Sequence, residues 1–419
     1  MSGAGIAANR SSEKVQQRAS HAHLSKDVSG IPAPPLRSSR GHLDAIIVPA
    51  SRPVPASFLQ PAIELAALMG AFLVVLCSKE TKVDQVAKRV AKTPGARSLI
   101  VPIRNGWKHH KFPTETSDDR FKRASAHRES DLSAKRNLGL LLARLHGWSK
   151  IAFVDDDITL TQTDNIARLA GQLDKHQVAG MLVRRFPDNS VVCHARRLAG
   201  LSQDVFVTGA VLGVHCNSLP LSFFPDIYNE DWFFFAEDAA TRKLPHVGYA
   251  TQAEYDPFAS PHRARRQEFG DLLAEGLYAL IGEEDPSLPF DEKLRGATKT
   301  YWSRFIGARH ETITEAKTTL CRFMNPHIKN CYVSSALDSL AAAEGQLDTI
   351  TPDLCVDFLK AWRADLSDWQ KFSTGINNVG STRDAMDFLE LKTWTLAEFG
   401  APAADSETAP PELMTSVAV

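Results

Sequence analysis

The chain has 419 residues, of which 43% are hydrophobic and 23% charged, an ordinary composition for a globular protein. Its 48 Lys and Arg nearly balance 49 Asp and Glu, leaving a formal net charge of −1, so we expect no nucleic-acid partner. No apolar run approaches the roughly 20 residues that a membrane-spanning helix needs, so we also expect no transmembrane segment. The six cysteines include no C-x-x-C pair, which favours reduced thiols and a cytoplasmic location.

The first part of the chain alternates between two apolar patterns. Residues 1–42 are rich in Ser, Ala, Arg and Pro, so we expect a disordered N-terminal tail. Short apolar runs typical of strands follow at 44–48, 72–77 and 98–102, separated by helical patterns at 58–69 and 82–91. Such alternation predicts an α/β fold, in which helices pack on the faces of a parallel sheet.

A polar stretch then interrupts this rhythm. Residues 104–130 are rich in Lys, Arg and His and have no apolar period, so the stretch is either a surface insertion or a lid over a ligand. An amphipathic helix is predicted over 133–148 and a strand over 151–154, with further strands within 180–197 and 205–215.

The last part of the chain is predicted to be helical. From about residue 270 to about 400 the pattern is helical, and Trp302, Phe305, Trp362 and Trp369 are the expected core anchors. We therefore divide the chain into a disordered tail (1–42), an α/β domain (43–268), a helical C-terminal region (269–400) and a second disordered tail (401–419).

Three consecutive aspartates, Asp155, Asp156 and Asp157, follow the predicted strand at 151–154. Ligands of open α/β sheets bind beyond the carboxyl ends of strands, and alternation places Asp155 and Asp157 on one side of the chain. Carboxylates this close ionise together most easily around a cation, and their hard oxygens suit Mg²⁺ or Mn²⁺. The alternative is a solvated acidic turn that caps the next helix.

Lys135 and Arg136 occupy the first turn of the helix that leads into this strand. Cations there oppose the helix dipole, and a bound anion such as a diphosphate would remove the conflict. The alternative is a solvated pair whose partners are Asp131 or Glu129.

Two further motifs carry ionisable groups. Glu230 and Asp231 stand among six Phe and Trp residues between 223 and 235, and an apolar setting raises a carboxyl pKa toward that of a general base. The alternative is a helix start capped by Asn229. His262, followed by clustered Arg, would complete a metal site and bind phosphate, unless it is only a basic helix start.

Four motifs in this order resemble those of nucleotide-sugar glycosyltransferases with the GT-A fold, particularly the large inverting family 2. The resemblance covers roughly residues 43–265. It rests on the following motifs: Val48-Pro-Ala-Ser51, the run from Ala134-Lys-Arg-Asn-Leu-Gly139 to Ile151-Ala-Phe-Val-Asp-Asp-Asp157, Val207-Thr-Gly-Ala-Val-Leu-Gly213, and Asn229-Glu-Asp-Trp232.

The resemblance implies a Rossmann-like mixed sheet with helices on both faces, followed by a helical C-terminal region without a counterpart in the family. It implies transfer of a sugar from a nucleoside diphosphate sugar to an acceptor hydroxyl, with Asp231 as the catalytic base and Glu230 as its neighbour. Asp157, Asp155 and His262 would bind Mn²⁺ or Mg²⁺. The implied donor-binding residues are Pro49, Ser51, Arg52, Lys135, Arg136, Asp155 and Asp156.

Two other functions stay open. Asp155, Asp157 and Thr159 also fit the D-x-D-x-T motif of haloacid-dehalogenase-type phosphatases, in which the first Asp attacks phosphate. The chain would otherwise be a non-catalytic GT-A-like module. The sugar, the acceptor and the oligomeric state do not follow from the sequence.

Overall fold

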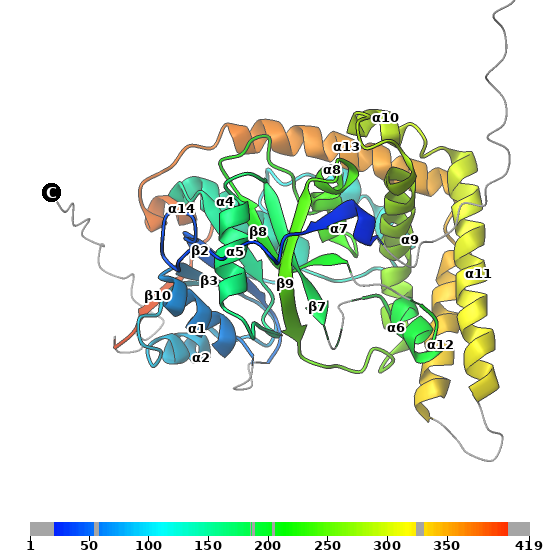
Figure 1. Ribbon diagram of the computed structural model, residues 1–419, viewed down its shortest axis with the longest axis horizontal. Coiled ribbons are helices and arrows are strands. Elements are labelled where there is room, and N and C mark those ends of the chain that lie inside the picture. Colours follow the sequence, from blue (N-terminus) through cyan, green and yellow to red (C-terminus); the bar gives the residue numbers. More distant parts are fainter. Residues whose placement is uncertain are drawn as a thin grey trace, which may run out of the picture.

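The computed structural model describes residues 21–53, 58–184, 186, 189–202, 206–323 and 331–400. It is an α/β structure around one mixed sheet of ten strands (Figure 1). The sheet order is β1 (Ser25–Asp27), β9 (Leu244–Gln252), β7 (Val178–Arg184), β8 (Val207–His215), β5 (Lys150–Val154), β2 (Ala45–Ala50), β3 (Phe72–Cys77), β4 (Arg97–Pro102) and β10 (Thr395–Glu398), and β6 (Ile158–Thr159) pairs with β9.

The directions of the central strands determine which segments of the chain meet at one edge of the sheet. Strand β2 pairs in parallel with β3 and with β5, as the alternating sequence pattern predicts. Strand β8, however, runs antiparallel between β5 and β7. The start of β8 therefore lies beside the end of β5, and residues after β2 and β5 meet residues at the beginning of β8.

Helices cover both faces of the sheet, as expected. Alternate side chains of each strand enter different cores: Ile46 and Val48 pack in one, while Ile47 packs in the other. The first core receives α1 (Gln60–Met69), α2 (Val83–Val90) and α5 (Asp164–Gln172). The second receives α3 (Asp119–Ala124), α4 (Leu132–His146), α6 (Val191–Leu198), α7 (Glu230–Phe234), α8 (Ala236–Ala240), α9 (Pro261–Glu283), α10 (Phe290–Leu294), α11 (Lys299–Phe323), α12 (Cys331–Leu347), α13 (Pro352–Thr374) and α14 (Thr382–Phe388).

The expected disordered N-terminal tail is wrong for residues 21–42. A short 3-10 helix, η1 (Ala22–Leu24), leads into β1, which extends the sheet by pairing in parallel with β9. Leu24 and Val28 are buried and anchor this segment, which crosses in front of the sheet before entering β2 (Figure 1). Residues 1–20 and the second expected tail, 401–419, lie outside the described residues.

The polar stretch 104–130 contains more structure than its sequence pattern predicts. It includes η2 (Glu115–Ser117) and α3, and it is fixed to α13 by the buried Asp365. The carboxylate of Asp365 accepts hydrogen bonds from the backbone N–H groups of Glu115 and Thr116 and from the Thr116 hydroxyl, at 2.9, 2.8 and 2.6 Å. Residues 191–198, expected in a strand, form α6 instead.

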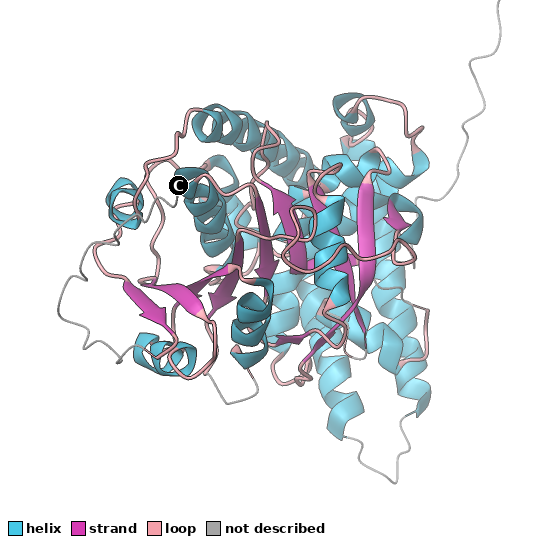
Figure 2. Ribbon diagram, turned by 60° about the vertical axis from the view of Figure 1, so that its left-hand side comes forward, coloured by secondary structure: helices cyan, strands magenta, loops and turns pink. Residues whose placement is uncertain are grey.

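The boundary expected between residues 268 and 269 falls inside a continuous helix, because α9 runs from Pro261 to Glu283. The long helices of the C-terminal region pack beside the sheet and along its rear (Figures 1 and 2). The chain then returns to the sheet as β10, antiparallel to β4. The four expected aromatic anchors of this region are all buried, so this prediction is confirmed.

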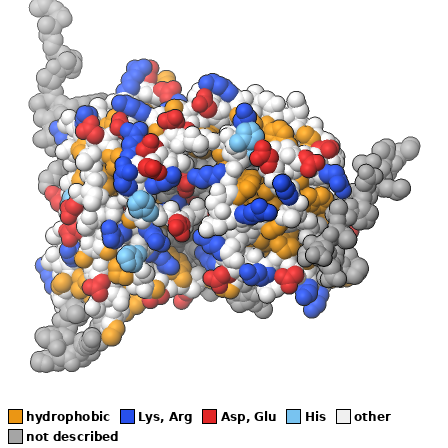
Figure 3. Space-filling model, turned by 180° about the vertical axis from the view of Figure 1, so that it is seen from behind, with side chains coloured by type: hydrophobic (Ala, Val, Ile, Leu, Met, Phe, Trp, Pro, Cys, Tyr) orange, Lys and Arg blue, Asp and Glu red, His pale blue; other side chains and the backbone are white. Residues whose placement is uncertain are grey.

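Two features concern the surface. Within the described residues, no helix combines the length and apolar character needed to cross a bilayer. The rear face mixes basic and acidic side chains over much of its area (Figure 3), in keeping with the balanced charge of the chain.

Candidate functional site

Three consecutive polar residues near the start of α4 reach three different parts of the fold. Lys135 donates to the carbonyl of Ala50, the last residue of β2, at 2.8 Å and to the hydroxyl of Ser78, directly after β3, at 2.6 Å. Asn137 exchanges two hydrogen bonds with the backbone of Phe224, each of 2.8 Å. Between them, Arg136 reaches the segment after β5 and the first residue of α7. The start of α4 therefore joins the segments that carry the sequence motifs.

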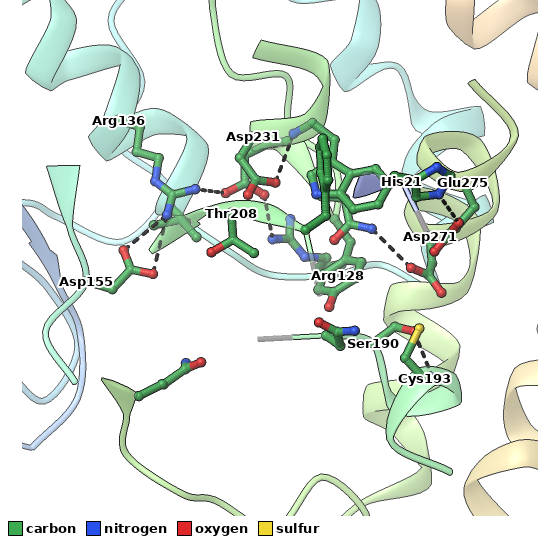
Figure 4. A pocket seen from close by; sticks show the side chains of 18 of the residues that line it. His21, Arg128, Arg136, Asp155, Ser190, Cys193, Thr208, Asp231, Asp271 and Glu275 are labelled. Atoms are coloured by element: carbon green, nitrogen blue, oxygen red, sulfur yellow. Dashed lines mark hydrogen bonds and ion pairs between the residues drawn. The ribbon is translucent and has the colours of Figure 1, made fainter. Parts of the chain in front are cut away.

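Arg136 links the aspartate triplet to the second acidic motif. Its guanidinium contacts the Asp155 carboxylate at 3.1 Å and the Glu230 carboxylate at 2.6 Å (Figure 4). Burial works against the charge of Arg136, but the two carboxylates outweigh it and raise the pKa of the guanidinium. Gly209 of β8 makes room for this group, because an added Cβ would lie 2.4 Å from Arg136 Nη1.

Arg136, Asp155 and Glu230 line a cavity at the end of β5 and the start of β8 (Figure 4). The cavity encloses about 180 Å³, or about 970 Å³ when the space open to solvent is included. Five residues singled out in the sequence contribute to its wall: Arg52, Arg136, Asp155, Glu230 and Asp231.

Asp156 and Asp157 lie behind this wall. Asp156 accepts hydrogen bonds from the backbone N–H groups of Ser51 and Arg52 at 3.2 and 3.4 Å, and so fixes the turn after β2. Asp157 forms an ion pair with Arg52 and accepts a hydrogen bond from Gln252 at 3.2 Å. Its Oδ1 is buried without a hydrogen-bond partner among the described residues. Burial and the neighbouring carboxylates raise the pKa of Asp157 to about 6, although Arg52 opposes the shift.

Glu230 and Asp231 begin α7 and are both buried. Asp231 accepts hydrogen bonds from the backbone N–H groups of Gly209 and Trp232. Burial raises the pKa of both carboxyl groups, and the nearby Arg136 works against the rise. The capping role considered for Asn229 is absent, because its side chain instead donates to Asp271 at 3.1 Å.

Two residues expected in the site lie elsewhere. Lys135 is buried beneath the strand ends and forms an ion pair with Asp131 at 3.3 Å, so it does not line the cavity. His262 is exposed on the first turn of α9 and lines a different cavity, so it is not placed with Asp155 and Asp157. Pro49 lies within β2 and Ser51 in the turn that follows it, and neither reaches the cavity wall.

Several lining residues were not anticipated. His21 comes from the expected disordered tail and contacts Glu275 of α9 at 2.9 Å. Gln252 ends β9, a strand that the sequence analysis missed because Pro245 and Gly248 interrupt its apolar pattern. Asp271 lies on the face of α9 that borders the cavity. In the sequence, the only sign of a shared role for Asp271 and Glu275 is their helical spacing. No local pattern around His21 indicates a site residue.

Comparison with known proteins adds no family assignment. No protein-family model matches the chain, and a search of curated proteins finds no significant relative.

Proposed function

We propose that the chain is a metal-dependent glycosyltransferase of the GT-A kind, which transfers a sugar from a nucleoside diphosphate sugar to an acceptor hydroxyl. The observation that carries the proposal is the bridge made by Arg136 between Asp155 and Glu230. Although residues 155 and 230 are 75 positions apart in the sequence, the two acidic motifs to which they belong face one cavity. A donor group and an acceptor group can meet there.

The donor end of the cavity would be the turn after β2 together with the end of β5. The backbone of residues 51 and 52 is fixed by Asp156, while Asp155 faces the cavity. We assign Asp155 and this turn to the nucleoside. Arg136 and Arg128 border the same space, and guanidinium groups pair well with phosphate oxygens. They would offset the charge of the diphosphate.

The acidic groups fit a divalent cation. Asp157 has a buried oxygen without a hydrogen-bond partner in the described part of the chain, and carboxylate oxygens are the ligands that Mg²⁺ and Mn²⁺ prefer. Asp157 and Asp155 would hold the ion, without His262. When bound, such an ion supplies charge neutralisation for the departing diphosphate. Arg52, which now pairs with Asp157, has a side chain that is 44% exposed, so it would turn toward solvent when the ion binds.

Asp231 would act as the general base. The oxygen of the acceptor hydroxyl attacks the anomeric carbon, and the proton of that hydroxyl passes to Asp231. The bond between the anomeric carbon and the diphosphate oxygen breaks, and the nucleoside diphosphate leaves. Burial raises the pKa of Asp231, which favours proton uptake. The two backbone N–H groups that bond to its oxygens hold the carboxylate in place. Glu230 is engaged by Arg136, so we assign it the positioning of that guanidinium.

Two substitutions separate donor binding from proton transfer. Asp157→Ala should abolish Mn²⁺-dependent binding of nucleotide sugars in a thermal-shift screen, since a ligand of the native state raises its melting temperature. Asp231→Asn should keep that binding but lower the release of nucleoside diphosphate by on the order of 10²-fold or more. Asp238→Asn is the matched control, because Asp238 lies on α8 outside this cavity.

The same assays decide between the alternatives. Hydrolysis of p-nitrophenyl phosphate that depends on Asp155, without turnover of nucleotide sugars, would indicate a phosphatase. An absence of any Mn²⁺-dependent nucleotide binding would indicate a non-catalytic module. Full activity of Asp231→Asn would refute the assignment of the base.

A further inference from the structure

A second cavity lies at the start of α9 and is distinct from the one described above. It has a volume of about 500 Å³ and opens to solvent. It is lined by exposed basic residues from two separate segments: Arg120, Arg123 and His127 near α3, and His262, Arg265 and Arg266 in the first turns of α9. Residues of α12 and α13 close it, among them Gln346 and Leu354. No carboxylate is among the described residues that line it.

The charges around this cavity are not neutralised by the protein. Arg120 has a partner, because it contacts Asp357 at 3.1 Å. Arg123, Arg265 and Arg266 form no ion pair with a described residue. This contrasts with Arg136 and Arg309, which are held by carboxylates. Like charges gathered in a concave surface repel one another, so a bound anion would relieve the repulsion.

The nearby acidic side chains are already engaged. Glu344 on α12 pairs with Lys317 at 2.6 Å, and Asp348, directly after α12, lies 3.6 Å from His310. On α13, Asp353 pairs with Lys299. These three carboxylates pair with groups of α11, whereas Asp357 of α13 is the one that pairs with a cavity residue, Arg120.

The backbone around the cavity also favours an anion. Ser260, which precedes α9, makes no side-chain hydrogen bond to cap this helix of 23 residues, and uncapped helix N-termini attract negative charge. Cations in the first turns of α9 therefore oppose its dipole unless an anion lies between them.

On the other side of the cavity, Ala126 and His127 both have positive φ values, of 46° and 51°, and residues other than glycine adopt this conformation at a cost. This turn directs His127 to the basic cavity and Arg128 to the first one.

We propose that this basic cavity is a binding site for a phosphorylated small molecule that carries at least two phosphate charges. Three unpaired guanidinium groups match a diphosphate or a pair of phosphates, and the volume lies within the roughly 300–1,000 Å³ typical of small-ligand sites. The proposal does not depend on the glycosyltransferase assignment, since none of its residues lines the first cavity.

The test uses the full chain in a chelator, so that no divalent ion can recruit phosphate to the aspartates. Inorganic pyrophosphate is titrated by calorimetry into the wild type and into Arg265→Ala/Arg266→Ala. The double variant should weaken binding by about tenfold or more, because two charge-assisted contacts are lost. The control is Arg295→Ala/Arg304→Ala, which removes two exposed arginines that do not line the cavity and should leave the affinity unchanged.

Three results would overturn the proposal: no binding of pyrophosphate to the wild type, equal weakening by the control pair, or weakening by Asp157→Ala but not by the α9 pair. Compared with the double alanine variant, Arg265→Lys/Arg266→Lys should restore part of the affinity, which separates a loss of charge from a folding defect.

A second experiment uses sedimentation with vesicles containing phosphatidic acid. Sedimentation that requires Arg265 and Arg266 identifies a lipid headgroup as the source of the phosphate, and pyrophosphate binding without sedimentation identifies a soluble ligand.

Discussion

Replacing Asp157 by Asn should stabilise the metal-free protein, although Asp157 is assigned to the metal site. The Asp157 side chain is 3% exposed, and one of its oxygens lacks a hydrogen bond within the described structure. Its pKa rises from 3.8 to about 6 because burial and the adjacent carboxylates disfavour the charge. This rise in the pKa corresponds to about 3 kcal/mol, at about 1.4 kcal/mol for each tenfold change in proton affinity.

The sign of the effect follows from proton binding. The folded state holds the Asp157 proton more tightly than the unfolded chain does, so stability falls as the pH rises from about 4 to about 6. Above that range the whole penalty is present, and below it both states are protonated and the penalty vanishes. Asn has the shape of the protonated carboxyl group and carries no charge.

Urea unfolding in a chelator measures this difference. Asp157→Asn should be more stable than the wild type by about 1–3 kcal/mol near pH 7.5 and equal to it near pH 4. Millimolar Mn²⁺ should raise the stability of the wild type alone. If the variant is less stable than the wild type near pH 7.5, or equally stabilised by Mn²⁺, then Asp157 is a structural residue and the reasoning is refuted.

Three further predictions concern how the cavity is built. Gly209→Ala should displace Arg136 and lower nucleotide-sugar turnover by about tenfold or more, whereas Gly307→Ala, which meets open space on α11, should leave turnover unchanged; equal activities would show that the close approach is unimportant. Arg128→Ala should raise the donor KM without a matching loss of kcat, and an unchanged KM would remove Arg128 from the donor site. Asp365→Ala leaves the backbone N–H groups of Glu115 and Thr116 unpaired, so urea unfolding should show a loss of about 2–4 kcal/mol. A loss below about 0.5 kcal/mol would contradict the anchoring of the 104–130 stretch.

Local patterns predicted most of the regular elements well. The apolar run at 72–77 coincides with β3, because a buried parallel strand needs continuous apolar residues. The aspartate triplet 155–157 also follows directly after a buried strand, β5, as predicted. The strand that completes the site, β9, was missed, since its interruption by Pro and Gly hides a pairing that depends on neighbours distant in the sequence.

The candidate site could be predicted only where a motif carries its own chemistry. Asp155 follows a buried strand and Asp231 stands in an apolar segment, and these settings predict a functional carboxylate at both positions. Both residues line one cavity. Lys135 and His262 were misplaced, because the sequence does not show which long-range partner a polar side chain will meet. Lys135 meets strand-end carbonyl and hydroxyl groups, and His262 faces away on the first turn of a long helix. His21 was missed for the same reason, since its partner Glu275 is 254 residues away.

The central claim is that the aspartate triplet and the acid pair beside Trp232 act on one activated sugar. Calorimetric titration of nucleotide sugars into the wild type, Asp157→Ala and Asp231→Asn, each with and without Mn²⁺, tests it most directly. We expect Mn²⁺-dependent binding to the wild type and to Asp231→Asn, and none to Asp157→Ala. Binding that is unaffected by Asp157→Ala, or no binding of any nucleotide sugar to the wild type, would contradict the claim.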